Sequence, residues 1–349
     1  MIPELLGSEV KIWDLMGNTE LPYHPTMDIH DASKIQCFMD SPRKYFYQYI
    51  LGWRIDSPNI HLVFGSAWHK AMEHLLLSLN GDDPYGVRVV GEAYDLFMET
   101  YREAFPNEYM DQQHGAKEPA NALKALAGYS GLWAEDIRRL QPLYTEVAGA
   151  VPVSDTRTLH FKLDSIVAQD GDAVLSMEHK TTGRLSQAWR DSWDVKFQPW
   201  LYTHALHTLF QDSNVRGVVI NGAVLRKKSN EFLRLPIAKS NEMMREGLWK
   251  ANHWLDQLEW NWQNLLNTSV HDDVMPAFPC NGESCSKFGC SFSAFCTTWP
   301  NALKHAHTPP PGYVQEFWDP RREEKDAKYL ATDGHITKVD GTSGTANGN

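Results

Sequence analysis

The sequence predicts an α/β fold in which a central mixed β-sheet is flanked by helices. Three observations lead to this class: helical patterns fill the first part of the chain, short alternating segments follow, and a helix then separates them from a further strand pair. The chain has 349 residues, of which 42% are hydrophobic, and this is enough for a sizeable core. Strands and helices in this order are expected to share one sheet.

Helical patterns dominate the part of the chain that precedes the strands. Residues 1–30 are interrupted by prolines and are expected to be irregular. Ser33 is expected to cap the first helix, and the Ser41-Pro42 step divides that helix in two, because a residue before proline disfavours helical geometry. Residues 85–142 are predicted to be a helical insertion. The helices expected in this part cover 33–51, 65–79, 86–105 and 118–141.

The pattern then changes to short β-branched segments with alternating polarity. A turn with the sequence Gln169-Asp170-Gly171-Asp172 predicts a hairpin between two of them. A further strand pair follows a helix and is joined by a basic turn, and a long helix rich in tryptophan comes after it. The expected strands cover 146–153, 158–168, 173–180, 215–225 and 230–237, and the expected helices cover 194–210 and 240–267.

The domain organisation predicted from these patterns is a single domain over residues 31–300. Residues 276–299 form a cysteine-rich loop at its end, and residues 305–349 are expected to be a flexible tail because they are rich in Pro, Gly, Ser and Thr. The sequence has no apolar run of the roughly 18–20 residues that a membrane-spanning helix needs. Its start lacks the features of a signal peptide, so we expect a cytoplasmic protein with no membrane partner.

The net charge of −11 argues against a protein coated in positive charge, although local basic patches, which decide contact with nucleic acid, remain possible.

One group of charged residues has a clear chemical interpretation. Asp164 closes an alternating strand, and Glu178 and Lys180 lie two apart on the next one, so their side chains share a face. A hairpin would bring Asp164 beside Glu178, where two carboxylates can bind Mg²⁺ or Mn²⁺.

Lys180 would lie on the same face as the metal, where its ammonium group could orient water or offset charge in the transition state. Two further pairs, each four residues apart on a predicted helix, strengthen this interpretation. His69 shares a helix face with Glu73, and a neutral imidazole can be a third metal ligand. Gln198 shares a face with Tyr202, and this amide and phenol could contact the DNA backbone or support Lys180.

Taken together, these segments resemble the PD-(D/E)XK nuclease superfamily, and within it the RecB-like iron–sulfur exonucleases, including their phage-encoded relatives. The matching segments occur in the family's order: Gly65 to Glu73, Phe161 to Asp164 without the usual glycine, Glu178-His179-Lys180, and Gln198 to Tyr202. The resemblance implies a restriction-endonuclease-like core, with Asp164, Glu178 and His69 as metal ligands. It also implies that Lys180, Gln198 and Tyr202 belong to the catalytic site.

Clustered cysteines in a cytosolic protein indicate a metal site more than disulfides. The spacing of the four late cysteines (Cys280, Cys285, Cys290 and Cys296) is compatible with a self-contained zinc site. The resemblance implies a different set, in which one early and three late cysteines hold a [4Fe–4S] cluster in a C-terminal loop. That set is Cys37, Cys285, Cys290 and Cys296, with Zn²⁺ as the alternative metal.

Aromatic and basic residues alternate near Cys37, a combination that suits single-stranded DNA because it offers stacking and positive charge. The candidate DNA-binding residues are Arg43, Lys44, Tyr45 and Tyr49; the alternative is a core helix with tyrosine edges exposed. The function expected from the residues and the resemblance together is a metal-dependent DNA exonuclease that acts on DNA ends or single strands, in recombination, repair or phage DNA processing. A replication or recombination protein could be its partner.

Two other functions are compatible with the same residues. One is an inert DNA-binding or assembly subunit that keeps the fold and the cluster, and the other is a sequence-specific endonuclease. The intact set of Asp164, Glu178 and Lys180 argues against the first. The sequence contains no G-x-x-x-x-G-K-[ST] segment, so no nucleotide-dependent helicase motif accompanies the predicted nuclease.

Overall fold

The computed structural model describes residues 23–282, 289–325, 327–332 and 334–339. The chain divides into two compact units, each assembled from three separate segments, whereas the sequence predicts one domain over 31–300. Unit 1 comprises residues 1–57, 152–160 and 245–321. Unit 2 comprises residues 58–151, 161–244 and 322–349. No helix within the described ranges is long and apolar enough to cross a membrane.

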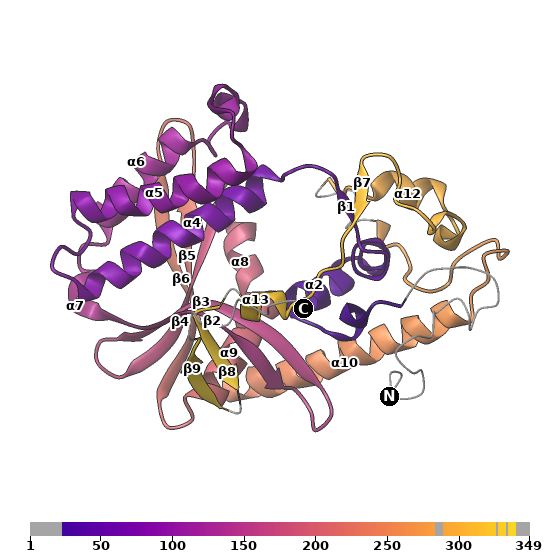
Figure 1. Ribbon diagram of the computed structural model, residues 1–349. Coiled ribbons are helices and arrows are strands. Elements are labelled where there is room, and N and C mark those ends of the chain that lie inside the picture. Colours follow the sequence, from indigo (N-terminus) through magenta and orange to yellow (C-terminus); the bar gives the residue numbers. More distant parts are fainter. Residues whose placement is uncertain (1–22, 283–288, 326, 333, 340–349) are drawn as a thin grey trace, which may run out of the picture. The chain divides into compact units, whose positions relative to one another are not determined.

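Unit 2 contains a seven-stranded mixed sheet in the order β6-β5-β4-β3-β2-β8-β9 (Figure 1). Pairs β4–β5 and β2–β8 are parallel, whereas β3–β4, β5–β6 and β8–β9 are antiparallel. The predicted α/β class with a central mixed sheet is therefore confirmed. The strands are β2 (Leu140–Pro152), β3 (Thr158–Gln169), β4 (Ala173–Thr182), β5 (Asn214–Val224), β6 (Glu231–Ile237), β8 (Tyr329–Thr332) and β9 (His335–Lys338).

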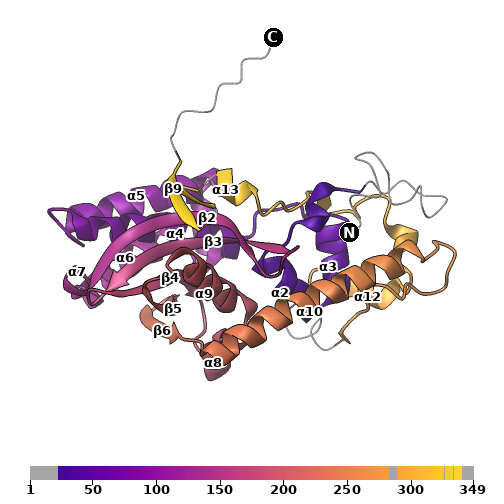
Figure 2. The same cartoon turned by 90° about the horizontal axis from the view of Figure 1, so that it is seen from below.

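Helices cover both faces of this sheet (Figures 1 and 2). On one face, α4, α5 and α6 surround a core that includes the fully buried rings of Phe64 and Phe97, packed edge to face at 5.0 Å. On the other face lies α9, which begins after a break at Lys196 in the predicted helix 194–210. The helices of unit 2 are α4 (Ile60–Leu77), α5 (Val87–Ala104), α6 (Pro119–Leu132), α7 (Asp136–Arg139), α8 (Gln187–Val195), α9 (Phe197–Leu209) and α13 (Arg322–Lys325).

The hairpin between β3 and β4 forms as the sequence predicts. Asp170 and Gly171 both have positive φ, which a tight turn of this sequence accommodates. The C-terminal segment differs from its prediction: instead of a flexible tail, residues 329–332 and 335–338 form two strands at the edge of the sheet. The pairing of β8 with β2 joins residues far apart in the chain, and no local pattern in so short a segment predicts such a contact.

Unit 1 is built around aromatic side chains and a two-stranded sheet in which β1 (Trp53–Ile55) pairs with β7 (Tyr313–Gln315). The Ser41-Pro42 break is confirmed, since Ser41 is extended and its side chain caps the helix that follows. The cap of the first helix is Asp31 rather than Ser33. The helices of unit 1 are α2 (Ala32–Asp40), α3 (Pro42–Tyr45), the π-helical turn η2 (Phe46–Ile50), α12 (Ser293–Thr298) and, from residue 245 on, α10 (Asn241–Leu266).

Candidate active site

The acidic residues Asp164 and Glu178 lie just beyond the regular antiparallel pairing of β3 with β4, where side chains accept the backbone hydrogen bonds. Regular pairing runs from Gln169–Ala173 to Ile166–Ser176, and the same register continued by two places sets Asp164 opposite Glu178. There the Asp164 amide donates to Glu178 Oε1 at 3.3 Å, and the His179 amide donates to Asp164 Oδ2 at 2.8 Å. Carboxylate oxygens thus accept the amide hydrogens of the two strands, which holds both acids in place.

Strand alternation determines which face the acidic group occupies. Leu175 and Met177 of β4 pack in a core cluster with Leu76 of α4. Alternate residues point to opposite faces, so Glu178 and Lys180 point away from that cluster. Lys180 Nζ lies 3.5 Å from Glu178 Oε2, which is buried and accepts no hydrogen bond from any described residue. The spacing of two in Glu178-His179-Lys180 therefore produces an ion pair beside Asp164.

His69 joins this group from α4. Its Nε2 lies 2.7 Å from the carbonyl oxygen of His179, which can only accept, so Nε2 carries a proton. Its Nδ1 then faces Asp164 Oδ1 at 3.2 Å. Burial would lower the pKa of His69, but the negative charge of Asp164 outweighs burial and raises it. Without a metal, a proton between His69 Nδ1 and Asp164 Oδ1 would satisfy both atoms. A metal cation could take the place of that proton.

The two carboxyl groups have opposite protonation tendencies. Burial raises the pKa of Glu178 to about 7, and the negative charge of Asp164 adds to this effect. For Asp164, burial acts in the same direction, but the positive charges of His69 and Lys180 outweigh it and hold its pKa well below the usual range. Burial would lower the pKa of Lys180, yet Asp164 and Glu178 raise it, so this amine is an ammonium ion at neutral pH.

Gln198 and Tyr202 lie together on α9, as their spacing predicts. The side-chain amide of Gln198 donates to the Tyr202 hydroxyl at 2.8 Å. Burial raises the pKa of Tyr202 well above its usual value, and the charges of Glu178 and Asp164 add to the rise, which places the phenol close to both acids. Pro199 is accommodated because it lies in the first turn of α9. Tyr202 is therefore a neutral hydrogen-bond donor beside the acidic group.

The arrangement of Asp164, Glu178 and His69 determines whether a divalent metal ion could bind here. No three His, Cys, Asp or Glu side chains within the described ranges already surround a common point for a metal ion. Asp164 and Glu178 instead accept hydrogen bonds from protein groups. Nevertheless, the residues fit a hard cation: two buried carboxylates lie on adjacent strands, Glu178 Oε2 lacks a hydrogen bond among the described residues, and His69 Nδ1 faces Asp164. Asp164, Glu178 and His69 are therefore the residues that would hold such an ion.

Several residues near the site are not among those predicted from the sequence. Ser176 donates to Glu178 Oε1 at 2.7 Å, and its spacing of two from Glu178 on one strand was the available clue. The C-terminal segment, predicted to be a tail, places Lys328 Nζ 2.9 Å from Glu73 Oε1. Glu323 of α13 is among the charges that raise the pKa of Lys180, so it also lies near the site. These last contacts depend on distant parts of the chain meeting.

The candidate DNA-binding residues occupy other roles in unit 1. Arg43 is buried, and its guanidinium donates to the carbonyl oxygens of Phe278 at 2.8 Å and Met275 at 3.3 Å. Tyr45 and Tyr49 are also buried. Lys44, in the last turn of α3, remains partly exposed. Arg43 and Tyr49 therefore lie in the core, because irregular backbone near residues 275–278 needs buried donors and the tyrosines fill the core, and their contact with DNA stays a prediction.

The cysteines predicted to hold a cluster belong to the same unit. Cys37, Cys290 and Cys296 are thiols rather than disulfides, and so is Cys280. Burial raises the pKa of Cys37 to about 12. Cys285 lies outside the described residues. The part of the chain that the structure describes contains no arrangement of three such ligands around one point.

The sequence was compared with known proteins. The family model of the PD-(D/E)XK nuclease superfamily matches residues 32–297, which is most of the chain. No curated protein matches the sequence significantly. The matched region contains the paired β3 and β4 strands with Asp164, Glu178 and Lys180, and its mixed sheet flanked by helices is the core expected for a restriction-endonuclease-like fold. The chain belongs to the PD-(D/E)XK nuclease superfamily, whose members are generally metal-dependent nucleases that act on nucleic acids.

Proposed function

We propose that this protein is a deoxyribonuclease that requires Mg²⁺ or Mn²⁺ and removes nucleotides from DNA ends or single strands. The observation that carries the proposal is the group formed by Asp164, Glu178 and Lys180, in which two buried carboxylates and an ammonium meet at the point where β3 and β4 stop pairing. The order of matching segments from Gly65 to Tyr202 supports placing the chain in the RecB-like group.

Each residue has a role that its surroundings support. Asp164 and Glu178 would hold the metal ion together with His69, and a bound divalent ion lowers the pKa of water and neutralises phosphate charge. Lys180 is charged and cannot accept a proton, so it would offset negative charge that develops on the phosphate. Tyr202, whose hydroxyl accepts from Gln198, keeps its own proton to donate to a phosphate oxygen.

A comparison of linear and covalently closed single-stranded DNA tests the exonuclease assignment. We expect release of mononucleotides or short fragments from the linear strand in Mn²⁺, and an intact closed circle, because an exonuclease needs an end. EDTA should stop the reaction on the linear strand. Cutting of the circle at a comparable rate would contradict the assignment and favour an endonuclease, and absence of metal-dependent cutting of either substrate would favour an inert DNA-binding subunit.

The [4Fe–4S] cluster on Cys37, Cys285, Cys290 and Cys296 is a separate proposal, supported by the resemblance. Protein purified without air is expected to be brown, with a broad absorbance band at the blue end of the visible range. The Cys37→Ser variant should lose this band and Cys280→Ser should keep it. A colourless wild-type protein that contains zinc would contradict the proposal and support the alternative metal.

A further inference from the structure

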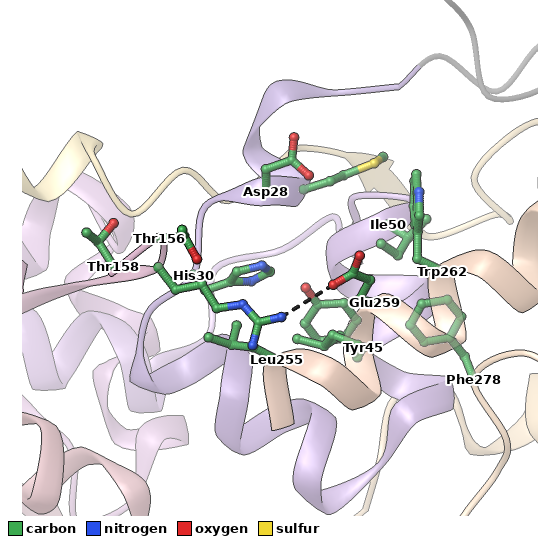
Figure 3. Close-up of a pocket in the computed structure, with 13 residues that line it drawn as sticks. Asp28, His30, Tyr45, Ile50, Thr156, Thr158, Leu255, Glu259, Trp262 and Phe278 are labelled. Atoms are coloured by element: carbon green, nitrogen blue, oxygen red, sulfur yellow. Dashed lines mark hydrogen bonds and ion pairs between the residues drawn. The ribbon is translucent and has the colours of Figure 1, made fainter. Parts of the chain in front are cut away.

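A pocket of about 340 Å³ lies in unit 1 and has no part in the proposed chemistry (Figure 3). Segments from distant parts of the sequence form its walls: the residues before α2, the turn between β2 and β3, α10 and the segment near Phe278. A volume of this size is within the range of pockets that hold small organic groups. The pocket is therefore large enough for one flat heteroaromatic ring with its immediate substituents.

Polar contacts fix the turn that forms one wall. Arg157 lies on this turn and pairs with Asp256 at 2.6 Å and with Glu259 at 3.3 Å, both on α10 (Figure 3 shows the second contact). Asn252 of α10 donates to the Val153 carbonyl at 2.8 Å. These bonds tie the turn to α10 on one side, and the His160 amide donates to the His30 carbonyl on the other. The walls are thus held before any ligand binds, which reduces the entropy cost of binding.

Aromatic rings supply much of the lining. The rings of Tyr45 and Phe278 are parallel to within 8°, with centroids 6.0 Å apart. Trp262, which is only partly buried on α10, contributes a third ring (Figure 3). Flat π surfaces favour flat π ligands, because a ring that stacks on Trp262 gains attraction beyond the area that it buries. An aliphatic ligand of equal volume would gain area burial but not this stacking.

The polar groups of the pocket exclude some ligands and favour others. His30 Nδ1 is buried and has no hydrogen-bond partner among the described residues, which leaves one group for a ligand to satisfy. The one arginine in the lining, Arg157, is already paired with the carboxylates of Asp256 and Glu259, and Asp28 adds negative charge. A phosphate would therefore be disfavoured, whereas an uncharged ring with donors and acceptors at its edge would fit.

We propose that this pocket binds a single unstacked base of a nucleic-acid strand. The proposal rests on the proposed function, because a nuclease supplies the ligand class: a flat, uncharged heteroaromatic ring with hydrogen-bonding edges. Trp262 would stack on the base, and His30 Nδ1 would meet one of its edge groups. The hydroxyl of Thr158 at the rim is available to a second edge group.

The test measures binding of a labelled oligothymidylate by fluorescence anisotropy, in EDTA and at one fixed salt concentration, because phosphate contacts are salt-dependent. A second strand of equal length carries abasic residues throughout. We expect Trp262→Ala to weaken binding of the thymidylate strand by roughly 5- to 150-fold, the range for loss of one base–aromatic stack. Binding of the abasic strand should not change, and Trp262→Phe should restore most of the affinity.

Trp260→Ala is the matched control, since Trp260 is on the same helix but 57% exposed and outside the pocket lining. The proposal is overturned if Trp262→Ala binds the thymidylate strand as tightly as Trp260→Ala does. It is also overturned if Trp262→Ala loses affinity for both strands equally, since the ring would then not act through a base. Metal-dependent cleavage by wild type in either case would leave the proposed function standing; failure of wild type to bind or cut DNA would overturn both.

Discussion

Replacement of Lys180 by alanine is expected to slow metal-dependent DNA cleavage by about 100- to 1,000-fold, the usual cost of removing one group that stabilises charge in a transition state. Its Nζ lies 3.5 Å from Glu178, and its pKa is raised by Asp164 and Glu178, so the wild-type residue is a fixed positive charge. The rate constant for cleavage of a linear strand under single-turnover conditions measures this effect on the chemical step.

Lys70→Ala provides the control for this experiment. Lys70 is exposed and is the neighbour of His69 on α4, so its removal changes the net charge of the protein equally. We expect the rate of this variant to stay within a factor of about two of wild type, because exposed charges away from the reacting groups contribute little. Equal rates for Lys180→Ala and wild type, with the fold verified by circular dichroism, would contradict the role given to Lys180.

The Glu178→Gln substitution is expected to abolish metal-dependent cleavage and yet stabilise the metal-free protein at high pH. The pKa of this carboxyl is raised from 4.5 to about 7, by burial first and then by Asp164. Between these values the folded protein holds the proton more tightly than the unfolded chain does, so its stability falls as the pH rises through this window. Above about pH 7 the full cost of the buried charge is present, whereas glutamine does not ionise.

At pH 8 we therefore expect the free energy of unfolding of Glu178→Gln to exceed that of wild type by a few kcal/mol, because each unit of pKa shift corresponds to about 1.4 kcal/mol. Below pH 4.5 the difference should largely vanish, since wild-type Glu178 is then protonated in both states. Urea unfolding in EDTA at several pH values measures the difference. An identical pH dependence in the two proteins would show that Glu178 is not a destabilising buried charge.

The central part of the fold follows from local sequence patterns. The Asp170-Gly171 turn and the alternation on either side of it fix the β3–β4 hairpin, and the hairpin alone is enough to set Asp164 opposite Glu178. The break before Pro42 is equally local. Residues whose place depends on one strand pair or one helical turn could therefore be predicted, including the neighbours Gln198 and Tyr202.

Features that depend on long-range packing could not be predicted in the same way. The pairing of β8 with β2, and with it the contact between Lys328 and Glu73, joins segments that are far apart in the chain. Alternating aromatic and basic residues have the same appearance whether they face a DNA strand or a core. In this protein the guanidinium of Arg43 donates to backbone carbonyl oxygens in the core. Features of this kind can be predicted only when the segment that each residue packs against is known.

Calorimetric titration of the protein with Mn²⁺ at pH 8 tests most directly whether Asp164 and Glu178 form one metal site. We predict that wild type binds Mn²⁺ with release of protons, because His69, whose pKa is raised, must lose its Nδ1 proton to act as a ligand. Asp164→Asn and Glu178→Gln should each weaken this binding by at least about tenfold, as expected when a ligand loses its charge. Unchanged Mn²⁺ affinity in both variants would contradict the assignment of the site.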